Sequence, residues 1–172
     1  AQKNQIQILQ AINQISKKYL LHFFLIGDKS NDSFKDNEDY VKSNELDKWV
    51  TIIDSQPKIE SFYKQFNIFV LASFYEGCPN VLFEAMLARC LCIVSQGANT
   101  DNFVHDGING LVYDGSTSML VSKLEAAIAM MQSGDGTIIT ENGNQYAREN
   151  FALHQMVNSY ESVYEMIVKN RK

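Results

Sequence analysis

The stretch SFYEGCPNVLFEAM, at positions 73–86, contains the local signals on which the fold prediction rests. The apolar run IFVLAS leads into it and is predicted to be a buried strand. A glycine and a proline then mark a turn, and the apolar residues of NVLFEAMLA predict a helix. Glu76 lies in the turn and Glu84 in the helix, with seven residues between them. The sequence therefore places two carboxylates at a strand–turn–helix junction.

Short apolar segments and helical segments alternate along the rest of the chain in the same way. Strands are predicted at 21–28, 49–54, 68–73, 91–95 and 110–113. Helices are predicted at 2–18, 38–46, 58–66, 80–88 and 116–170, with a polar loop at 29–37 and a turn at 134–137. Strands that are apolar on both faces are typical of a parallel sheet covered by helices. We predict an α/β fold with a doubly wound, Rossmann-like, mostly parallel sheet and a helical C-terminal region.

Length and composition narrow the class of protein. The chain has 172 residues, of which 45% are hydrophobic and 20% charged, as expected for one ordinary globular domain spanning 1–172. Its net charge is −5 and its three arginines are scattered, so no basic face for nucleic acid is expected. No apolar run approaches the ~20 residues that would span a membrane. Three cysteines without a histidine partner predict reduced thiols in a cytoplasmic protein and no metal site.

The turn between the predicted strand and helix is a candidate anion site. In parallel sheets, ligands bind at the carboxyl ends of strands, where turns lead into helices. Gly77 is expected to release the backbone from the usual φ restriction, and Pro79 to preset φ for helix entry. The first N–H groups of the helix, from about Asn80 to Phe83, lack intrahelical partners and carry the positive end of the helix dipole. Phosphate is the usual occupant of such a site.

The two glutamates suit a sugar ligand. A carboxylate accepts two hydrogen bonds at once and so matches a vicinal diol, as on ribose or a hexose. One glutamate could hold the ribose of a nucleotide and the other the sugar beyond its diphosphate. The alternative is that Glu84 is favoured by the helix dipole alone and that Glu76 is simply solvated. The spacing leaves both interpretations open.

A wider pattern adds to this interpretation. The segment SFYEGCPNVLFEAMLARCLCIVS, followed by HDGINGLVYD, closely resembles the family 4 glycosyltransferases, which are retaining nucleotide-sugar enzymes of the GT-B fold. KNQIQILQAI at the start, LIGD after the first predicted strand and NIFVLAS before the turn are also similar to this family. The resemblance runs from Lys3 to about Tyr164. It covers only the C-terminal, donor-binding domain, so the N-terminal acceptor domain is expected to be absent.

The resemblance implies a role for each matched residue. Glu76 would contact the donor-sugar hydroxyls near the anomeric carbon and is the expected catalytic residue. Glu84 would hold the ribose hydroxyls, and Lys3 would neutralise the phosphates, which two carboxylates would otherwise repel. Backbone N–H groups at Asn80 and Val81 would meet the diphosphate. The expected donor nucleotide-sugar site comprises Lys3, Gly77, Cys78, Asn80, Val81 and Glu84.

Several positions depart from the family pattern. Arg89 and Leu91 stand where the family usually has glycine and proline, and Asn102 stands where it usually has glutamate. Each change alters a backbone feature and leaves the two glutamates in place. We interpret the changes as signs of a divergent donor pocket.

Three classes of function follow from these patterns. The first is the donor domain of a retaining glycosyltransferase that transfers a sugar from a nucleotide-diphosphate sugar to a glycan or glycolipid acceptor. It would need no cofactor or metal, could associate peripherally with a membrane, and would be inactive without its second domain. The second is a sugar-nucleotide epimerase of the GT-B fold. The third is a non-catalytic module that binds nucleotide-sugars or proteins.

The resemblance also raises a question about the centre of the sheet. The family has a further strand before the helix that begins near Gln2. In the doubly wound order 3-2-1-4-5-6 that strand lies between LHFFLIG and IFVLAS. We expect one of two outcomes. Either Phe23–Ile26 pairs directly with Ile68–Leu71, or an upstream segment or partner chain supplies the strand.

Overall fold

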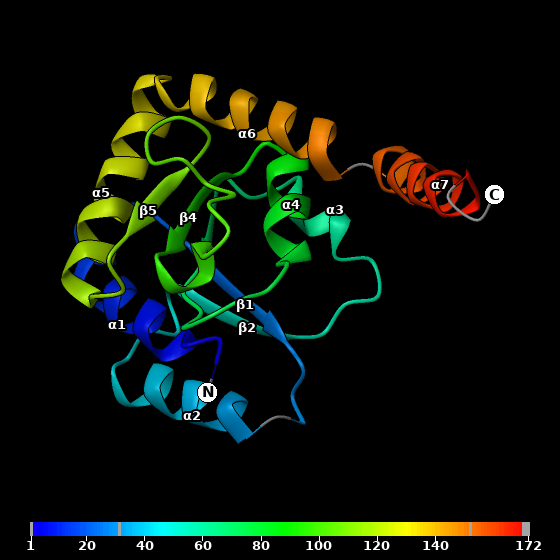
Figure 1. The fold of residues 1–172 in the computed structure, drawn as a ribbon. Coiled ribbons are helices and arrows are strands. Elements are labelled where there is room, and N and C mark those ends of the chain that lie inside the picture. Colours follow the sequence, from blue (N-terminus) through cyan, green and yellow to red (C-terminus); the bar gives the residue numbers. More distant parts are fainter. Residues whose placement is uncertain (1, 31, 152, 170–172) are drawn as a thin grey trace.

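The structure is a computed structural model in which residues 2–30, 32–151 and 153–169 are described (Figure 1). The strands are β1 (Phe23–Gly27), β2 (Val50–Asp54), β3 (Ile68–Leu71), β4 (Leu91–Ser95) and β5 (Leu111–Tyr113). The helices are α1 (Gln5–Ile15), α2 (Asp32–Ser43), α3 (Glu60–Tyr63), α4 (Asn80–Leu87), α5 (Thr117–Ser133), α6 (Gly136–Phe151) and α7 (Leu153–Lys169), with a 3₁₀ turn, η1, at Gly97–Asn99. Every predicted strand is present, and the predicted helical C-terminal region is confirmed.

The strands form two parallel sheets, one of β1 and β2 and one of β3, β4 and β5. Strand β4 shows how helices cover both faces. Leu91 and Ile93 pack in a core with α1 and α5, whereas Cys92 and Val94 pack in a second core with α4 and α6. Because successive residues of a strand point to opposite faces, a fully apolar strand requires such a double cover. Figure 1 shows the strands between α5 on the left and α4 on the right, which confirms the doubly wound α/β fold.

Of the two expected outcomes, the structure contradicts the direct pairing of Phe23–Ile26 with Ile68–Leu71. Strand β1 is hydrogen-bonded to β2, and β3 to β4, and no strand pairing joins β1 to β3 within the described residues. The two strands nevertheless adjoin. Phe24 stacks on Phe66, just before β3, with ring centroids 5.4 Å apart, and both strands contribute side chains to one core. The alternative, a further strand between them, stays a prediction.

The predicted polar loop at 29–37 is also partly wrong, because α2 already begins at Asp32. Phe34 and Val41, seven residues apart and so on one helix face, are buried in the structure. The intervening residues are polar, so the sequence showed no clear period in this segment. Burial of these two side chains stabilises a helix that the local sequence does not predict.

Arg89 shows how one departure from the family pattern is accommodated. Its φ is 62°, in the left-handed region that glycine adopts without cost and that costs other residues about 1 kcal/mol. Its guanidinium forms an ion pair with Glu141, with Nε 2.7 Å from a carboxylate oxygen. Asn102, at another departure, also has a positive φ of 54°. Both changes are absorbed locally, since α4 and β4 lie where they were predicted.

Candidate functional site

The candidate site lies in the loop between β3 and α4, at the carboxyl end of β3. The N-terminal segment is attached to this loop by two hydrogen bonds. The backbone N–H of Phe74 donates to the carbonyl of Gln2 at 3.0 Å, and the Gln2 side chain donates to the carbonyl of Tyr75 at 2.9 Å. Residues more than 70 positions apart in the sequence are thereby brought together. Lys3 consequently lies beside the loop that carries Glu76.

Glu76 is held at one of its two carboxylate oxygens. The Lys3 ammonium and the Ser73 hydroxyl both donate to Oε1, each at 2.6 Å. The Glu76 side chain is 10% exposed and the Lys3 side chain is 49% exposed. Burial alone would raise the pKa of the Glu76 carboxyl, but the bonds from Lys3 and Ser73 outweigh it and hold the pKa below its ordinary value. Glu76 is therefore ionised at neutral pH, and both of these hydrogen bonds are made to the same carboxylate oxygen.

The end of β4 and the turn that follows it contact this loop directly. Ser73 is fully buried, and its carbonyl accepts a hydrogen bond from the Ser95 hydroxyl at 2.5 Å. Ser95 in turn accepts from the N–H of Ala98 at 3.1 Å. Gly97 packs against the backbone of Phe74, and a Cβ added to this glycine would lie 2.1 Å from the Phe74 carbonyl oxygen. The backbone on both sides of Glu76 is thus fixed by contacts with a neighbouring strand.

The N-terminus of α4 offers free donors next to Glu76. The helix begins at Asn80, no side chain caps it, and the N–H of Leu82 bonds the carbonyl of Pro79. Asn80 and Val81 are exposed, and their N–H groups have no partner among the described residues. Such a terminus can bind an anion. The structure thus provides the donors that the sequence predicted.

Gly77 and Cys78 lie on the same turn, and both are exposed. The expectation that Gly77 uses glycine's freedom in φ is wrong. The φ of Gly77 does not lie in the left-handed region, and a Cβ added at this position would meet nothing within 4 Å. Nothing in the geometry of this turn therefore requires glycine. The Cys78 thiol is free, as predicted.

Glu84 lies one turn into α4 and is partly buried. Its carboxylate neighbours the hydroxyl of Tyr63 at the end of α3. Burial and the adjacent Glu84 raise the pKa of Tyr63, so this phenol stays protonated and can donate to the carboxylate. Sequence analysis did not predict this proximity, because Tyr63 and Glu84 lie on different helices.

The structure brings together some of the predicted site residues and adds others. Lys3 and Glu76 are in direct contact, whereas Gly77, Cys78, Asn80, Val81 and Glu84 follow Glu76 along the turn and helix. Sequence reasoning missed Ser73 and Ser95. A serine three residues before a glutamate at the end of a strand is a local signal that indicates Ser73. Ser95 has no such signal, because β4 contacts the loop only in the folded chain.

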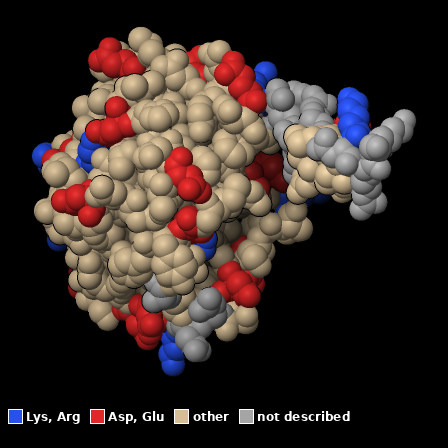
Figure 2. Space-filling model, viewed as in Figure 1, with Lys and Arg blue, Asp and Glu red and all other residues tan. Residues whose placement is uncertain are grey.

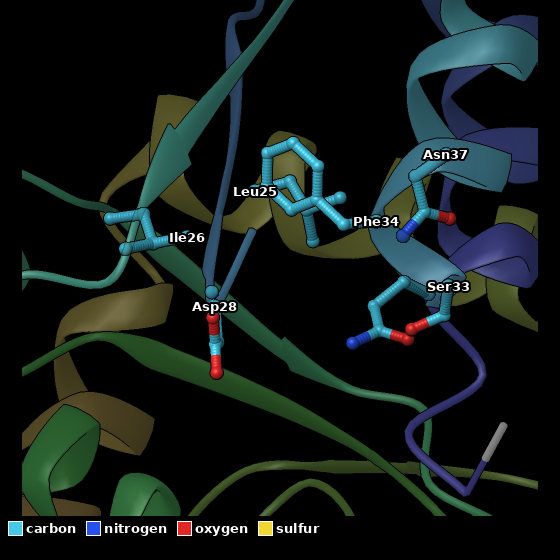
Figure 3. Close-up of a pocket in the computed structure, with 8 residues that line it drawn as sticks. Leu25, Ile26, Asp28, Ser33, Phe34 and Asn37 are labelled. Carbon is cyan, nitrogen blue, oxygen red and sulfur yellow. The ribbon is translucent and has the colours of Figure 1, made fainter. Parts of the chain in front are cut away.

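A separate small pocket lies at the carboxyl end of β1 (Figure 3). Its volume is about 60 Å³, and its lining comprises Gln5, Leu25, Ile26, Gly27, Asp28, Ser33, Phe34 and Asn37. Asn37 is only 4% exposed. A pocket of this size has room for a few water molecules. The pocket includes none of the residues around Glu76.

Three further observations concern surface charge, metal ligands and membrane-spanning helices. On the face seen in Figure 2, lysines and arginines are dispersed among acidic and uncharged residues and form no continuous basic patch. Among the described residues, no group of three or more His, Cys, Asp or Glu side chains is arranged to hold a metal ion. None of the helices in the described part of the chain is long and apolar enough to cross a membrane.

Comparison with protein families identifies the chain. Residues 1–130 match the family model described as "Glycosyl transferases group 1". The chain belongs to this family. The loop carrying Glu76 and the whole of α4 lie within the matched residues.

Individual relatives of this group 1 glycosyltransferase chain agree with the assignment. The "Vi polysaccharide biosynthesis protein VipC/TviE" of Salmonella typhi is 22% identical over 115 residues, covering 64% of this chain and 20% of that protein. A glycosyltransferase from Rickettsia africae superposes with a TM-score of 0.91 at 17% identity, covering 99% of this chain and 46% of that one. Anabaena Alr3699/HepE, in complex with UDP-glucose, superposes with a TM-score of 0.81 at 18% identity, covering 98% and 46%. The two structures share the fold, and the chain spans less than half the length of each of these proteins.

Proposed function

We propose that this chain is the donor-binding domain of a retaining glycosyltransferase that transfers a sugar from a nucleotide-diphosphate sugar to a glycan or glycolipid acceptor. One observation carries the proposal. The ionised Glu76, paired with Lys3, stands immediately before a helix whose first N–H groups are free. That arrangement combines an anion site with a carboxylate for sugar hydroxyls.

The charges of the site fit a diphosphate. Two carboxylates beside a pyrophosphate would repel it, and the Lys3 ammonium offsets part of that repulsion. An ammonium group has three donors, and only one is used in the bond to Glu76. The half-exposed Lys3 can therefore hold Glu76 and a phosphate oxygen together. We assign the diphosphate to Lys3 and to the N–H groups of Asn80 and Val81.

The sugars are assigned to the two glutamates. Glu84, one turn into α4, is assigned to the ribose hydroxyls, and the protonated phenol of Tyr63 lies near its carboxylate. Glu76 is assigned to the donor sugar near the anomeric carbon. The complex of Anabaena HepE with UDP-glucose supports a UDP-sugar donor, and the Vi polysaccharide protein supports a polysaccharide product. The anomeric configuration of the product, followed by NMR during the reaction, tests whether transfer is retaining.

The other two classes of function have less support. An epimerase would act on the nucleotide-sugar itself, whereas the matched family and the compared relatives are named for glycosyl transfer and polysaccharide synthesis. A non-catalytic module would bind the nucleotide-sugar without turnover. Incubation of the full-length protein with labelled UDP-glucose and an acceptor glycan distinguishes them, because only a transferase moves the label to the acceptor.

We expect Glu84→Gln to weaken the binding of free UDP about five- to a hundredfold. The reason is the loss of a charged acceptor for two ribose hydroxyls, worth ~1–3 kcal/mol. Isothermal titration calorimetry of UDP gives the comparison with the unchanged protein. Glu76→Gln should leave UDP affinity nearly unchanged, because free UDP carries no donor sugar. Equal losses in the two variants would contradict the assignment of ribose to Glu84.

We also expect nucleotide binding to be independent of divalent metal. Lys3 and the helix N–H groups supply the positive charge that a metal would otherwise provide. UDP titrations in the presence of EDTA and in the presence of Mg²⁺ or Mn²⁺ should give the same dissociation constant. A marked loss of affinity with EDTA that added Mg²⁺ restores would show that the site uses a metal.

A further inference from the structure

Glu76 is held asymmetrically, and one of its two partners is completely enclosed. Ser73 is buried, and its hydroxyl donates to Oε1 at 2.6 Å, the same oxygen that accepts from Lys3. Oε2 has no hydrogen-bond partner among the described residues. The two donors therefore fix one oxygen and leave the other for a ligand.

We propose that Ser73 is a positioning residue that orients the Glu76 carboxylate, so that Oε2 faces the donor sugar. This inference rests on the proposed function of Glu76. The Lys3 side chain is half exposed and ends in a flexible four-carbon stem, so its ammonium can exchange Glu76 for a phosphate oxygen. Ser73 cannot do so, because its own backbone is tied to Ser95 of β4. The hydroxyl is thus the fixed support of Glu76, and the ammonium is the adjustable one.

Positioning of this kind has a mechanistic benefit. A catalytic group must be held within about 0.5 Å of its working geometry by residues that are themselves locked. A carboxylate without such a bond rotates about its last torsion, which is broad for glutamate. The chain of contacts from Ala98 through Ser95 and Ser73 to Glu76 supplies the required rigidity.

The proposed role of Ser73 predicts a change in the pKa of Glu76 and in the pH dependence of kcat. Lys3 is the one charged group in contact with Glu76 among the described residues, and Ser73 is the one hydroxyl. Each stabilises the ionised carboxylate, so removal of the Ser73 hydroxyl raises the pKa of Glu76. If transfer requires ionised Glu76, the acidic limb of the kcat profile moves to higher pH in the same variant.

The test compares Ser73→Ala with Ser16→Ala in the full-length protein. Ser16 is also buried, but its hydroxyl has no hydrogen-bond partner among the described residues. Ser16→Ala therefore removes a buried hydroxyl, as Ser73→Ala does, without removing a contact to Glu76. The Glu76 carboxyl is titrated by NMR after selective ¹³C labelling of glutamate, and its signal is assigned with Glu76→Gln. We expect the Glu76 pKa to rise in Ser73→Ala, and kcat at acidic pH to fall roughly three- to tenfold. Ser16→Ala should change neither.

Ser73→Cys provides a second variant of similar size. Because a thiol is a weak donor, it should give a smaller rise in the Glu76 pKa than alanine does. An unchanged pKa in both Ser73 variants would overturn the inference. A raised pKa with an unmoved acidic limb would instead support the orienting role and refute the proposed catalytic role of Glu76. The two failures are therefore distinguishable.

Discussion

Glu76→Gln is expected to lower sugar transfer by the full-length enzyme about 10²- to 10⁴-fold. The glutamine side chain keeps the shape of glutamate but carries no charge, so it cannot stabilise positive charge that develops at the anomeric carbon. The loss should appear in kcat, while the affinity for free UDP stays close to that of the unchanged protein. Initial rates with a saturating donor, together with UDP calorimetry, measure both quantities.

Glu125→Gln is the matched control for this prediction. Glu125 also accepts a bond from a lysine, Lys18, with Nζ 2.7 Å from Oε1, but it lies on α5, outside the candidate site. Loss of this solvent-exposed pair should change stability little and leave transfer unchanged. A Glu76→Gln enzyme with near-normal kcat would refute the catalytic assignment. The site would then be a binding site only.

Gly97→Ala is expected to destabilise the protein by about 1–3 kcal/mol and to impair transfer. The added Cβ would lie 2.1 Å from the carbonyl oxygen of Phe74 and 2.8 Å from its carbonyl carbon. These are backbone atoms, so no side-chain rotation can relieve the clash, and the segment before Glu76 must shift. A misplacement of 1 Å in a catalytic site can cost about a hundredfold in rate. Urea denaturation gives the free energy of unfolding, and the transfer assay gives the rate.

Gly77→Ala serves as the comparison, because it adds the same methyl group to the same loop. An added Cβ at Gly77 meets nothing within 4 Å, and its φ is not positive. We expect a change in stability within about 0.5 kcal/mol, or a slight gain from the reduced entropy of the unfolded chain. Similar stabilities for the two variants would show that the Gly97 contact relaxes at no cost.

Local patterns in the sequence were sufficient to predict the order of strands and helices. The run IFVLAS and the helix NVLFEAMLA lie where their apolar residues indicated, because β-branched runs and helical periods reflect burial on one or two faces. The alternation of these elements also predicted the layered parallel fold, because a strand with two apolar faces needs helices on both sides. The position of Glu76 in the turn and of Glu84 in α4 followed directly.

The contacts that organise the site were decided by the tertiary structure. Lys3 and Glu76 lie 73 residues apart in the sequence and meet because β3 brings its loop beside the start of α1. Ser95 reaches Ser73 only because β4 pairs with β3 in a particular register. No local periodicity encodes such pairs, since each depends on the relative placement of whole elements.

The same reason explains the errors. The sequence did not show the early start of α2 and did not decide between the two expected arrangements of β1 and β3, because both depend on packing between elements distant in sequence. Arg89 occupies a left-handed conformation that its own preference disfavours, held where α4 must turn back toward β4. The sequence alone thus determined the order of the elements and which turn carries the carboxylates. Only the folded chain decided which donors hold Glu76, because those donors come from elements that are remote until the core forms.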